Sequence, residues 1–253
     1  MVNPDYDWRL SVHGTGEALV LVPGMDGTGQ LFYRQTPSLS ESFRTATYAL
    51  RSNALTMDTL VDDLGRVIDA VAPETRRAIV VGESFGGALA MSFALARPEQ
   101  VSALVVLNSF PYFAPQFRLR LARYGLALLP WGAMALIRRA TAFRLHSPHT
   151  HREEIGRFME LTAAASRDGY LNRLQLLMSY DIRHRLRDLR PPALFLAAEQ
   201  DHLVPSMQQA ELMVSLVPHG TLHVLHGHGH ICLIAPDVCL RDILLPWLKT
   251  AAP

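Results

Sequence analysis

Apolar residues occur along the chain both in short runs and in longer stretches with helical spacing. The short runs predict buried β-strands near residues 8–13, 18–22, 44–49, 78–82, 102–107, 193–198 and 221–226. The longer stretches predict helices near residues 57–71, 86–97, 206–216 and 237–249. Because the strands alternate with helices, we expect an α/β fold with a mostly parallel central sheet flanked by helices.

One long interval lacks any strand pattern. Residues 112–187, between the strand near 102–107 and the next one at Ala193, have the pattern of several helices. The chain is therefore predicted to form a core from residues 1–111 and 188–253, with a helical insertion at residues 112–187. A chain of 253 residues is long enough to bury one such core and still carry an insertion.

The most informative motif lies where the strand near 78–82 meets the helix near 86–97. It reads Gly-Glu-Ser-Phe-Gly at residues 82–86, the G-x-S-x-G pattern of a nucleophile elbow in its strand–turn–helix context. A serine on so sharp a turn has a strained backbone and close neighbours, so only small residues fit two positions away on either side. Ser84 is also expected at a helix N-terminus, where backbone amides favour a developing negative charge.

A carboxylate and a histidine follow later strands in the order that a nucleophile elbow requires. Asp201 comes after the run at 193–198, and His230 comes after the run at 221–226. With these residues and the elbow, the chain resembles the α/β-hydrolase superfamily over nearly its whole length. The resemblance implies that Ser84 is the nucleophile, that His230 takes and returns its proton, and that Asp201 orients His230. It also implies that the helical insertion is a cap.

Neighbouring residues leave alternatives open at two of these positions. Glu199 is a rival to Asp201 as the acid, and His228 is a rival to His230 as the base. Alternating histidines at residues 223–230 can also bind zinc, but such sites usually include a cysteine or a carboxylate at compatible geometry. The sequence therefore predicts no metal.

A glycine-rich loop follows the second apolar run and reads Pro-Gly-Met-Asp-Gly-Thr-Gly at residues 23–29. In the family, the oxyanion hole is made by one backbone amide from this loop and by the amide after the nucleophile, here Phe85. The family has His-Gly where this chain has Pro23-Gly24, so Met25 is the matching donor. A backbone donor tolerates that change. The loop has none of the phosphate-binding patterns of nucleotide sites, so no cofactor is predicted.

Two motifs narrow the resemblance further. The loop at 23–29 and the elbow at 82–86 are similar to those in the hydrolase portion of plant phytyl ester synthases and diacylglycerol acyltransferases. This similarity favours an oxygen ester of a hydrophobic acid or alcohol as the substrate. It leaves both hydrolysis and acyl transfer open.

The helical insertion is strongly basic. Residues 111–187 hold 13 arginines, no lysine and 5 acidic side chains, a net charge of +8. The rest of the chain holds 11 basic and 18 acidic side chains, so the formal net charge of +1 conceals a polarised molecule.

In the front half of the insertion, arginines alternate with apolar residues. The arginines expected to contact an anionic partner are Arg118, Arg120, Arg123, Arg138 and Arg139, and the apolar residues expected to line the substrate pocket are Phe113, Phe117, Leu121, Leu129 and Trp131. A basic and apolar surface suits an anionic lipid interface, or an acyl chain on an acyl carrier protein or coenzyme A. The alternative is an ordinary amphipathic helical cap in an arginine-rich protein. No nucleic-acid recognition motif is present.

Composition supports a globular protein in a reducing compartment. Hydrophobic residues make up 49% of the chain and charged residues 19%, which is typical of a folded domain. The two cysteines, Cys232 and Cys239, are expected to be free thiols. The acidic start lacks the apolar region of a signal peptide, and the uncharged stretch at 125–137 is too short to cross a bilayer. These features predict a cytoplasmic protein without a transmembrane segment.

Taken together, the motifs predict a serine hydrolase that cleaves carboxylic esters of hydrophobic acyl or alcohol groups through an acyl-enzyme. Three alternatives remain. The first is an esterase or thioesterase for carrier-bound acyl groups, similar to the pimeloyl-carrier-protein methyl ester esterases. The second is an acyltransferase on the same scaffold, and the third is a non-catalytic binding protein.

Overall fold

The computed structural model describes residues 9–113, 124–125 and 145–251. Its centre is a seven-stranded sheet with the strand order β1-β3-β2-β4-β5-β6-β7. The strands are β1 (Ser11–His13), β2 (Ala18–Val22), β3 (Arg44–Thr47), β4 (Ala78–Glu83), β5 (Val101–Leu107), β6 (Ala193–Ala198) and β7 (Gly220–Leu225). All neighbouring pairs are parallel except β1 and β3. The predicted mostly parallel sheet is confirmed.

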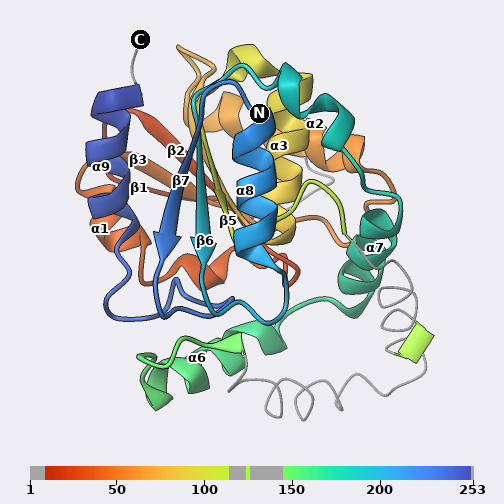
Figure 1. Cartoon of the computed structure of the whole chain (residues 1–253), viewed down its shortest axis with the longest axis vertical. Coiled ribbons are helices and arrows are strands. Elements are labelled where there is room, and N and C mark those ends of the chain that lie inside the picture. The colour runs from red at the N-terminus through yellow and green to blue at the C-terminus, as the bar shows by residue number, and fades with distance from the viewer. Residues whose placement is uncertain (1–8, 114–123, 126–144, 252–253) are drawn as a thin grey trace.

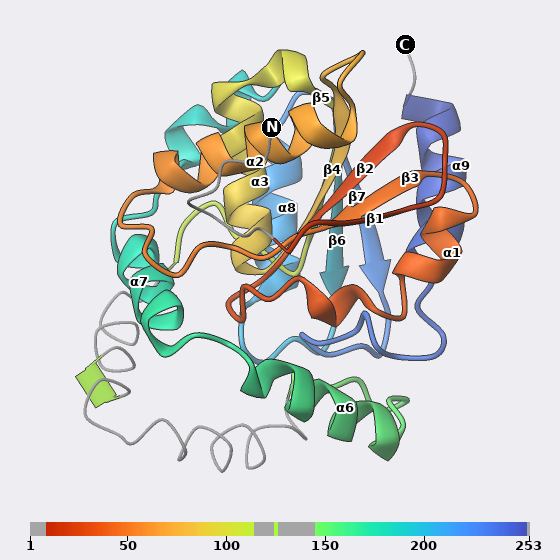
Figure 2. The same cartoon turned by 180° about the vertical axis from the view of Figure 1, so that it is seen from behind.

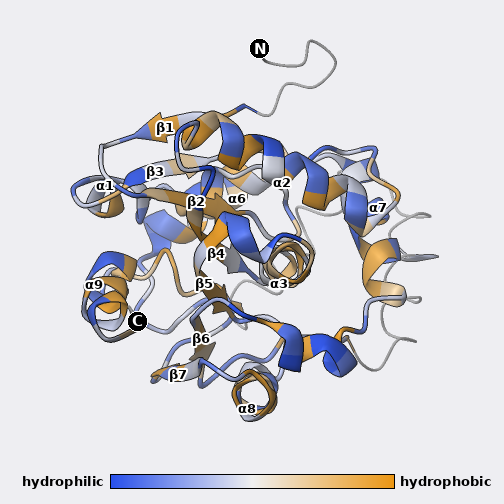
Figure 3. Cartoon of the chain, turned by 90° about the horizontal axis from the view of Figure 1, so that it is seen from above, coloured by the Kyte–Doolittle hydropathy of each residue, from blue (hydrophilic) through white to orange (hydrophobic). Residues whose placement is uncertain are grey.

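Helices cover both faces of the sheet (Figures 1 and 3). On one face lie α1 (Thr36–Ser40) and α9 (Leu240–Ala251), and on the other lie α2 (Met57–Val71), α3 (Phe85–Ala96) and α8 (Ser206–Leu216). The central strands, which are enclosed between these layers, are apolar along most of their length, as the hydropathy colours show.

The four predicted helices are present. The last begins at Leu240 rather than near residue 237, because turns closed by Ala235 N–H to Cys232 O and Val238 N–H to Ala235 O precede it. The sequence patterns did not predict the short helix α1 or the 3₁₀ turns at Gln30–Phe32 and Pro98–Gln100, whereas the 3₁₀ turn at Arg183–Asp188 lies at the end of the segment predicted to be helical. Segments of this length carry too few apolar repeats to produce a periodic signal.

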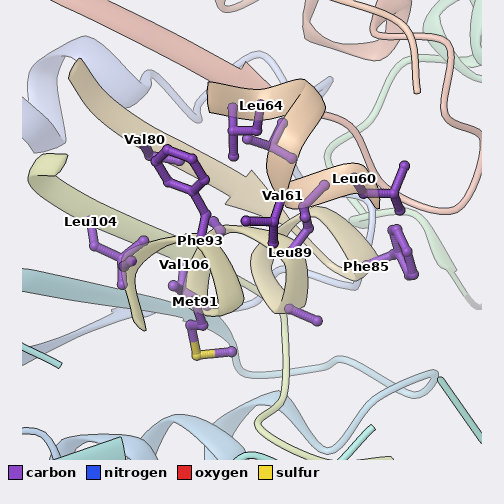
Figure 4. Packing of buried hydrophobic residues seen from close by; sticks show 14 of the residues in the cluster. Leu60, Val61, Leu64, Val80, Phe85, Leu89, Met91, Phe93, Leu104 and Val106 are labelled. Carbon is purple, nitrogen blue, oxygen red and sulfur yellow. The ribbon is translucent and has the colours of Figure 1, made fainter. Parts of the chain in front are cut away.

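The core on the α2–α3 face depends on one helix that is apolar all round and another that is apolar on one side. Because α3 is enclosed between the sheet and α2, Leu89, Met91 and Phe93 are all buried although they point in different directions (Figure 4). In contrast, α2 buries only one stripe, which includes Leu60 and Leu64. This packing fixes α3, and with it the elbow that precedes α3, against β4.

The insertion leaves and rejoins the core at one place. An isolated antiparallel bridge pairs Tyr112 with Asp181, and the Ile182 amide donates to Pro111 O at 2.8 Å. Between these points lie α6 (Arg152–Ala163), which crosses below the carboxyl ends of the strands, and α7 (Arg167–Met178), to one side of them (Figures 1 and 2). The predicted helices are thus found here, while the division into core and cap domains stays a prediction.

Among the helices of the part of the chain that the structure describes, none is both long enough and apolar enough to cross a bilayer.

Candidate active site

Ser84 occupies the sharp turn between β4 and α3. Its backbone angles are φ 53° and ψ −117°, a strained conformation for a residue with a side chain. A Cβ on Gly82 would lie 2.2 Å from the oxygen of Gly86, and one on Gly86 would lie 2.1 Å from the oxygen of Val22. The predicted reason for glycine at both positions is therefore confirmed.

Hydrogen bonds to the end of β5 and to the residues just after it hold this turn in place. The Ser84 amide donates to Leu107 O at 2.9 Å, and the Ser109 hydroxyl donates to Ser84 O at 2.6 Å. Only 8% of Ser84 is exposed. The serine is therefore a fixed, mostly buried hydroxyl at the carboxyl edge of the sheet.

Asp201 lies on the loop after β6, and its carboxylate is held by several donors. Oδ1 accepts from the amides of Leu203 at 2.9 Å and Val204 at 3.0 Å, while Oδ2 accepts from the Ser206 hydroxyl. Oδ2 also lies 2.7 Å from Nδ1 of His230. Burial alone would raise the pKa of Asp201, but the charge and hydrogen bond of His230, with the other donors, bring it below its usual value. Asp201 is therefore an ionised partner of His230.

His230 is buried on the loop after β7. Burial lowers its pKa, but the charge of Asp201, their hydrogen bond and the nearby carboxyl of Glu83 outweigh this, so the pKa of His230 is raised overall. Because Nδ1 faces Asp201, Nε2 is the nitrogen left for another partner. Ser84 and His230 line the same cavity.

The rival residues have other surroundings. Nδ1 of His228 pairs with the Ser147 hydroxyl at 2.9 Å, and its Nε2 lies 3.6 Å from Asp237. Glu199 faces His226 at 3.6 Å and accepts from the Gly227 amide at 3.0 Å. The structure therefore pairs Asp201 with His230. Neither Glu199 nor His228 takes part in that pair. Among the described side chains, no group of three suitable ligands is arranged to hold a metal.

The loop at 23–29 passes beside the elbow, and Met25 lines the same cavity as Ser84. The Met25 amide donates no hydrogen bond within the described ranges. The Phe85 amide is the first of α3 and thus one of the unpaired donors of a helix N-terminus. The two predicted oxyanion donors are therefore both near Ser84, although their role stays a prediction.

Arg173, which holds this loop in place, was not predicted from the sequence. Arg173 projects from α7, is buried, and donates from Nε to Met25 O at 3.0 Å and from Nη2 to Asp26 O at 3.2 Å. Its guanidinium packs so tightly on Gly27 that a Cβ there would lie 2.7 Å away. Arg173 thus holds in position the segment that carries the Met25 amide, and links it to α7.

Asn108 was also missed, although its place directly after β5 was a usable signal. Its side-chain amide donates to the backbone oxygen of His230 at 2.8 Å, and its Oδ1 accepts from the Ala198 amide at 2.8 Å. One buried side chain thus links the ends of β5 and β6 to the loop of His230. Asn108 is a positioning residue for the histidine.

Glu83 stands beside the serine and brings a further acidic group to the site. It is buried, and burial together with the charges of Asp26 and Asp201 raises its pKa to about 7, although His230 acts in the opposite direction. Its carboxyl is therefore only partly ionised at neutral pH.

Two unequal cavities meet at Ser84. The larger, of about 570 Å³, is lined mainly by apolar and aromatic side chains of the core and of α7, including Phe110, Phe113 and Leu177. The smaller, of about 150 Å³, is lined by Glu83, His230 and residues of α6 and α7. Met25, Ser84, Tyr170 and Leu203 border both.

Of the predicted pocket residues, Phe113 lines the larger cavity. The others, Phe117, Leu121, Leu129 and Trp131, lie outside the described residues, as do Arg118, Arg120, Arg123, Arg138 and Arg139. The expected contact with an anionic partner therefore stays a prediction.

Cys232 and Cys239 are free, as predicted.

Comparison with known proteins agrees with the fold. The model of the Alpha/beta hydrolase family matches residues 19–241, so the chain belongs to this family. A relative from Serratia proteamaculans, named "Putative carbamate hydrolase RutD", is 30% identical over 91% of this chain and 90% of its own length. One of the same name from Azorhizobium caulinodans is 28% identical over 95% of this chain and 94% of its own length.

Solved structures show the same architecture. A thermophilic esterase from Thermogutta terrifontis superposes with a TM-score of 0.84 at 20% identity, over 96% of this chain and 93% of its own. An enol-lactonase from Burkholderia xenovorans has a TM-score of 0.80 at 16% identity, over 95% of this chain and 94% of its own. At these identities the likeness shows the fold, and family membership supports a hydrolase.

Proposed function

We propose that this hydrolase cleaves carboxylic esters of hydrophobic acids through an acyl-enzyme on Ser84. The observation that supports this most is the pairing of Asp201 with His230 at 2.7 Å, in a cavity that Ser84 also lines. The strained Ser84 then serves as the nucleophile, the buried His230 as its base, and the ionised Asp201 as the group that orients the histidine.

In the first half of the reaction, Nε2 of His230 takes the hydroxyl proton of Ser84 as Oγ attacks the ester carbonyl. The carbonyl oxygen becomes an oxyanion, which the amides of Met25 and Phe85 stabilise. The bond between the carbonyl carbon and the leaving oxygen then breaks. The leaving oxygen takes the proton from Nε2 and departs as an alcohol, while the acyl group stays on Ser84.

In the second half, water replaces the alcohol. His230 takes a proton from the water as its oxygen attacks the acyl carbon, and a second oxyanion forms at the same amides. The bond to Oγ breaks, Ser84 regains its proton from His230, and the carboxylic acid leaves. Asp201 keeps Nδ1 protonated and stabilises the imidazolium in both halves.

The cavities suggest where each part of the ester binds. The larger has the volume and the mostly apolar lining typical of a small-molecule site. It is lined by Phe110, Phe113 and Leu177 and suits a hydrophobic acyl chain. Burying successive methylene groups there should stabilise the transition state until the cavity is full.

A series of ethyl esters from acetate to palmitate tests this proposal. We expect kcat/KM to rise by roughly threefold for each added methylene over the short members, as each buries more apolar surface, and then to level off. Acid release is followed by titration at constant pH, with the enzyme-free rate of each ester as the control. A preference for acetate over all longer acids would contradict the assignment of the larger cavity.

Carbamate hydrolysis is the second candidate, because two relatives that match nearly the full chain bear that name. A carbamate has the same carbonyl for Ser84 to attack, but its acyl part is far smaller than a cavity of about 570 Å³. Ethyl carbamate therefore belongs in the same series. Turnover of ethyl carbamate above that of every ethyl ester would favour the second candidate over the first.

A further inference from the structure

His146 is a buried polar side chain that the proposed reaction does not use. It lies on the cap segment just before α6, lines the smaller cavity, and is only 6% exposed. Neither of its ring nitrogens has a hydrogen-bond partner in the part of the chain that the structure describes. A buried polar group without a partner is unfavourable in a folded protein, so such a group facing a cavity points to a ligand.

The position of His146 is fixed by the loop that carries His230. The Ile231 amide donates to Leu145 O at 2.8 Å, and His146 forms a parallel bridge with Ile231. A Cβ on Gly229 would lie 3.0 Å from His146 O, so glycine is needed for this close approach. The imidazole also packs edge-on against Phe158, with 4.9 Å between the ring centroids.

The smaller cavity is on the side where the leaving alcohol must be. His230, which protonates the leaving oxygen, lines the smaller cavity, whereas the larger one is lined by Asp201. Because a general acid must lie within hydrogen-bond reach of the atom it protonates, the alcohol part of the ester extends into the smaller cavity. The acyl part is then directed into the larger one.

The polar groups of the smaller cavity indicate the chemistry of that alcohol. Burial lowers the pKa of His146 to about 4, so its ring is neutral near pH 7 and offers one donor and one acceptor. Glu83, at the end of β4, contributes a partly ionised carboxyl to the same cavity. An anionic group would be repelled by Glu83, whereas a hydroxyl can both donate and accept. A volume near 150 Å³ holds about five water-sized non-hydrogen atoms.

We propose that the smaller cavity binds a compact leaving alcohol with a second hydroxyl group, which hydrogen-bonds to His146 and Glu83. The substrates are then esters of a hydrophobic acid with a short polyol of the size of ethylene glycol or glycerol. This inference rests on the proposed ester hydrolysis and adds its selectivity for the alcohol. His146 is the residue that determines this specificity.

A matched pair of substrates tests the proposal. Propyl octanoate and hydroxyethyl octanoate differ only in whether the far end of the alcohol is a methyl or a hydroxyl group. We expect kcat/KM to be about tenfold or more higher for the hydroxyethyl ester, because the propyl ester leaves His146 unpaired. The test is therefore the ratio of kcat/KM for the hydroxyethyl ester to kcat/KM for the propyl ester. A ratio near one in the unsubstituted protein would overturn the proposal, and this measurement needs no variant.

His146→Leu identifies the source of the preference. The variant should lower the ratio of kcat/KM for the hydroxyethyl ester to that for the propyl ester several-fold, toward one, because the hydroxyl of the alcohol then has no partner at position 146. Dividing the two ratios removes any intrinsic difference in ester reactivity. Thr150→Val is the matched control, because Thr150 is in the same segment, is 8% exposed, has an Oγ1 without a described partner, and lines neither cavity. Its ratio should stay that of the unsubstituted protein.

The remaining outcomes are also decisive. A His146→Leu variant that keeps the full ratio would overturn the role of His146. If thermal unfolding shows that His146→Leu does not fold, His146→Asn is the second variant, because asparagine keeps a donor and an acceptor at shorter reach. His146→Asn should lower the ratio of the two kcat/KM values but leave it above one. An unchanged ratio would contradict the proposal. Absence of turnover with both octanoate esters would instead overturn the proposed ester hydrolysis, and this inference with it.

Discussion

Replacing Ser84 by alanine is expected to lower kcat/KM for ethyl octanoate by about 10⁴-fold or more. The substitution removes the only atom of Ser84 that can form the acyl-enzyme, while the strained turn, the glycines around it and the bond from Ser109 to Ser84 O all remain. The variant should therefore fold with nearly unchanged stability. Initial rates measured beside a thermal unfolding curve separate loss of chemistry from loss of structure.

Ser92→Ala is the matched control for this experiment. Ser92 lies on α3, eight positions along from Ser84, and its hydroxyl donates to Ala88 O at 2.9 Å within the same helix. Its loss should leave kcat/KM within about threefold of the original value. A Ser84→Ala enzyme that keeps more than about one hundredth of the activity would mean that another group attacks the ester.

His230→Ala is expected to have the next largest effect, a loss of about 10³-fold or more in kcat/KM. Without the imidazole, Ser84 loses the group that takes its proton, and Asp201 loses its partner. His228→Ala is the matched control, because His228 is on the same loop but bonds to Ser147 rather than to Asp201. The kcat/KM of the His228→Ala variant should fall by less than about tenfold. The reverse order of the two losses would make His228 the base.

The pH dependence of kcat/KM distinguishes the same two histidines without a substitution. A general base acts in its neutral form, so kcat/KM rises with pH through the pKa of the base. Asp201 raises the pKa of His230 above its ordinary 6.5 despite burial, whereas burial lowers that of His228 below 6.5. We therefore expect the midpoint of the acidic limb above pH 6.5. A midpoint below that value would favour His228.

The sheet and its larger helices were predictable because each produces a local pattern. The strands β2, β4, β5 and β6 are apolar runs enclosed on both faces, and α2 has a one-sided apolar stripe. The elbow was predictable for a similar reason, since its glycines are dictated by neighbours within the same turn and by the adjacent strand. Such constraints leave a signal in a short stretch of sequence.

The supporting residues of the site were not predictable in this way. Arg173 lies 148 positions from Met25, whose carbonyl it binds, and Asn108 lies 122 positions from His230. The choice between His228 and His230 as the partner of Asp201 likewise depends on how two loops meet, not on spacing. Contacts of this kind exist only after the sheet has brought the ends of its strands together.

Labelling with a fluorophosphonate is the first measurement to make on this protein. Such a reagent transfers its phosphonyl group to an activated serine, and mass spectrometry of the digested protein locates the added mass. We predict a single adduct per chain, on Ser84, and none in Ser84→Ala. An unlabelled wild-type protein, or an adduct on any other residue, would contradict the proposal that Ser84 is the nucleophile of a serine hydrolase.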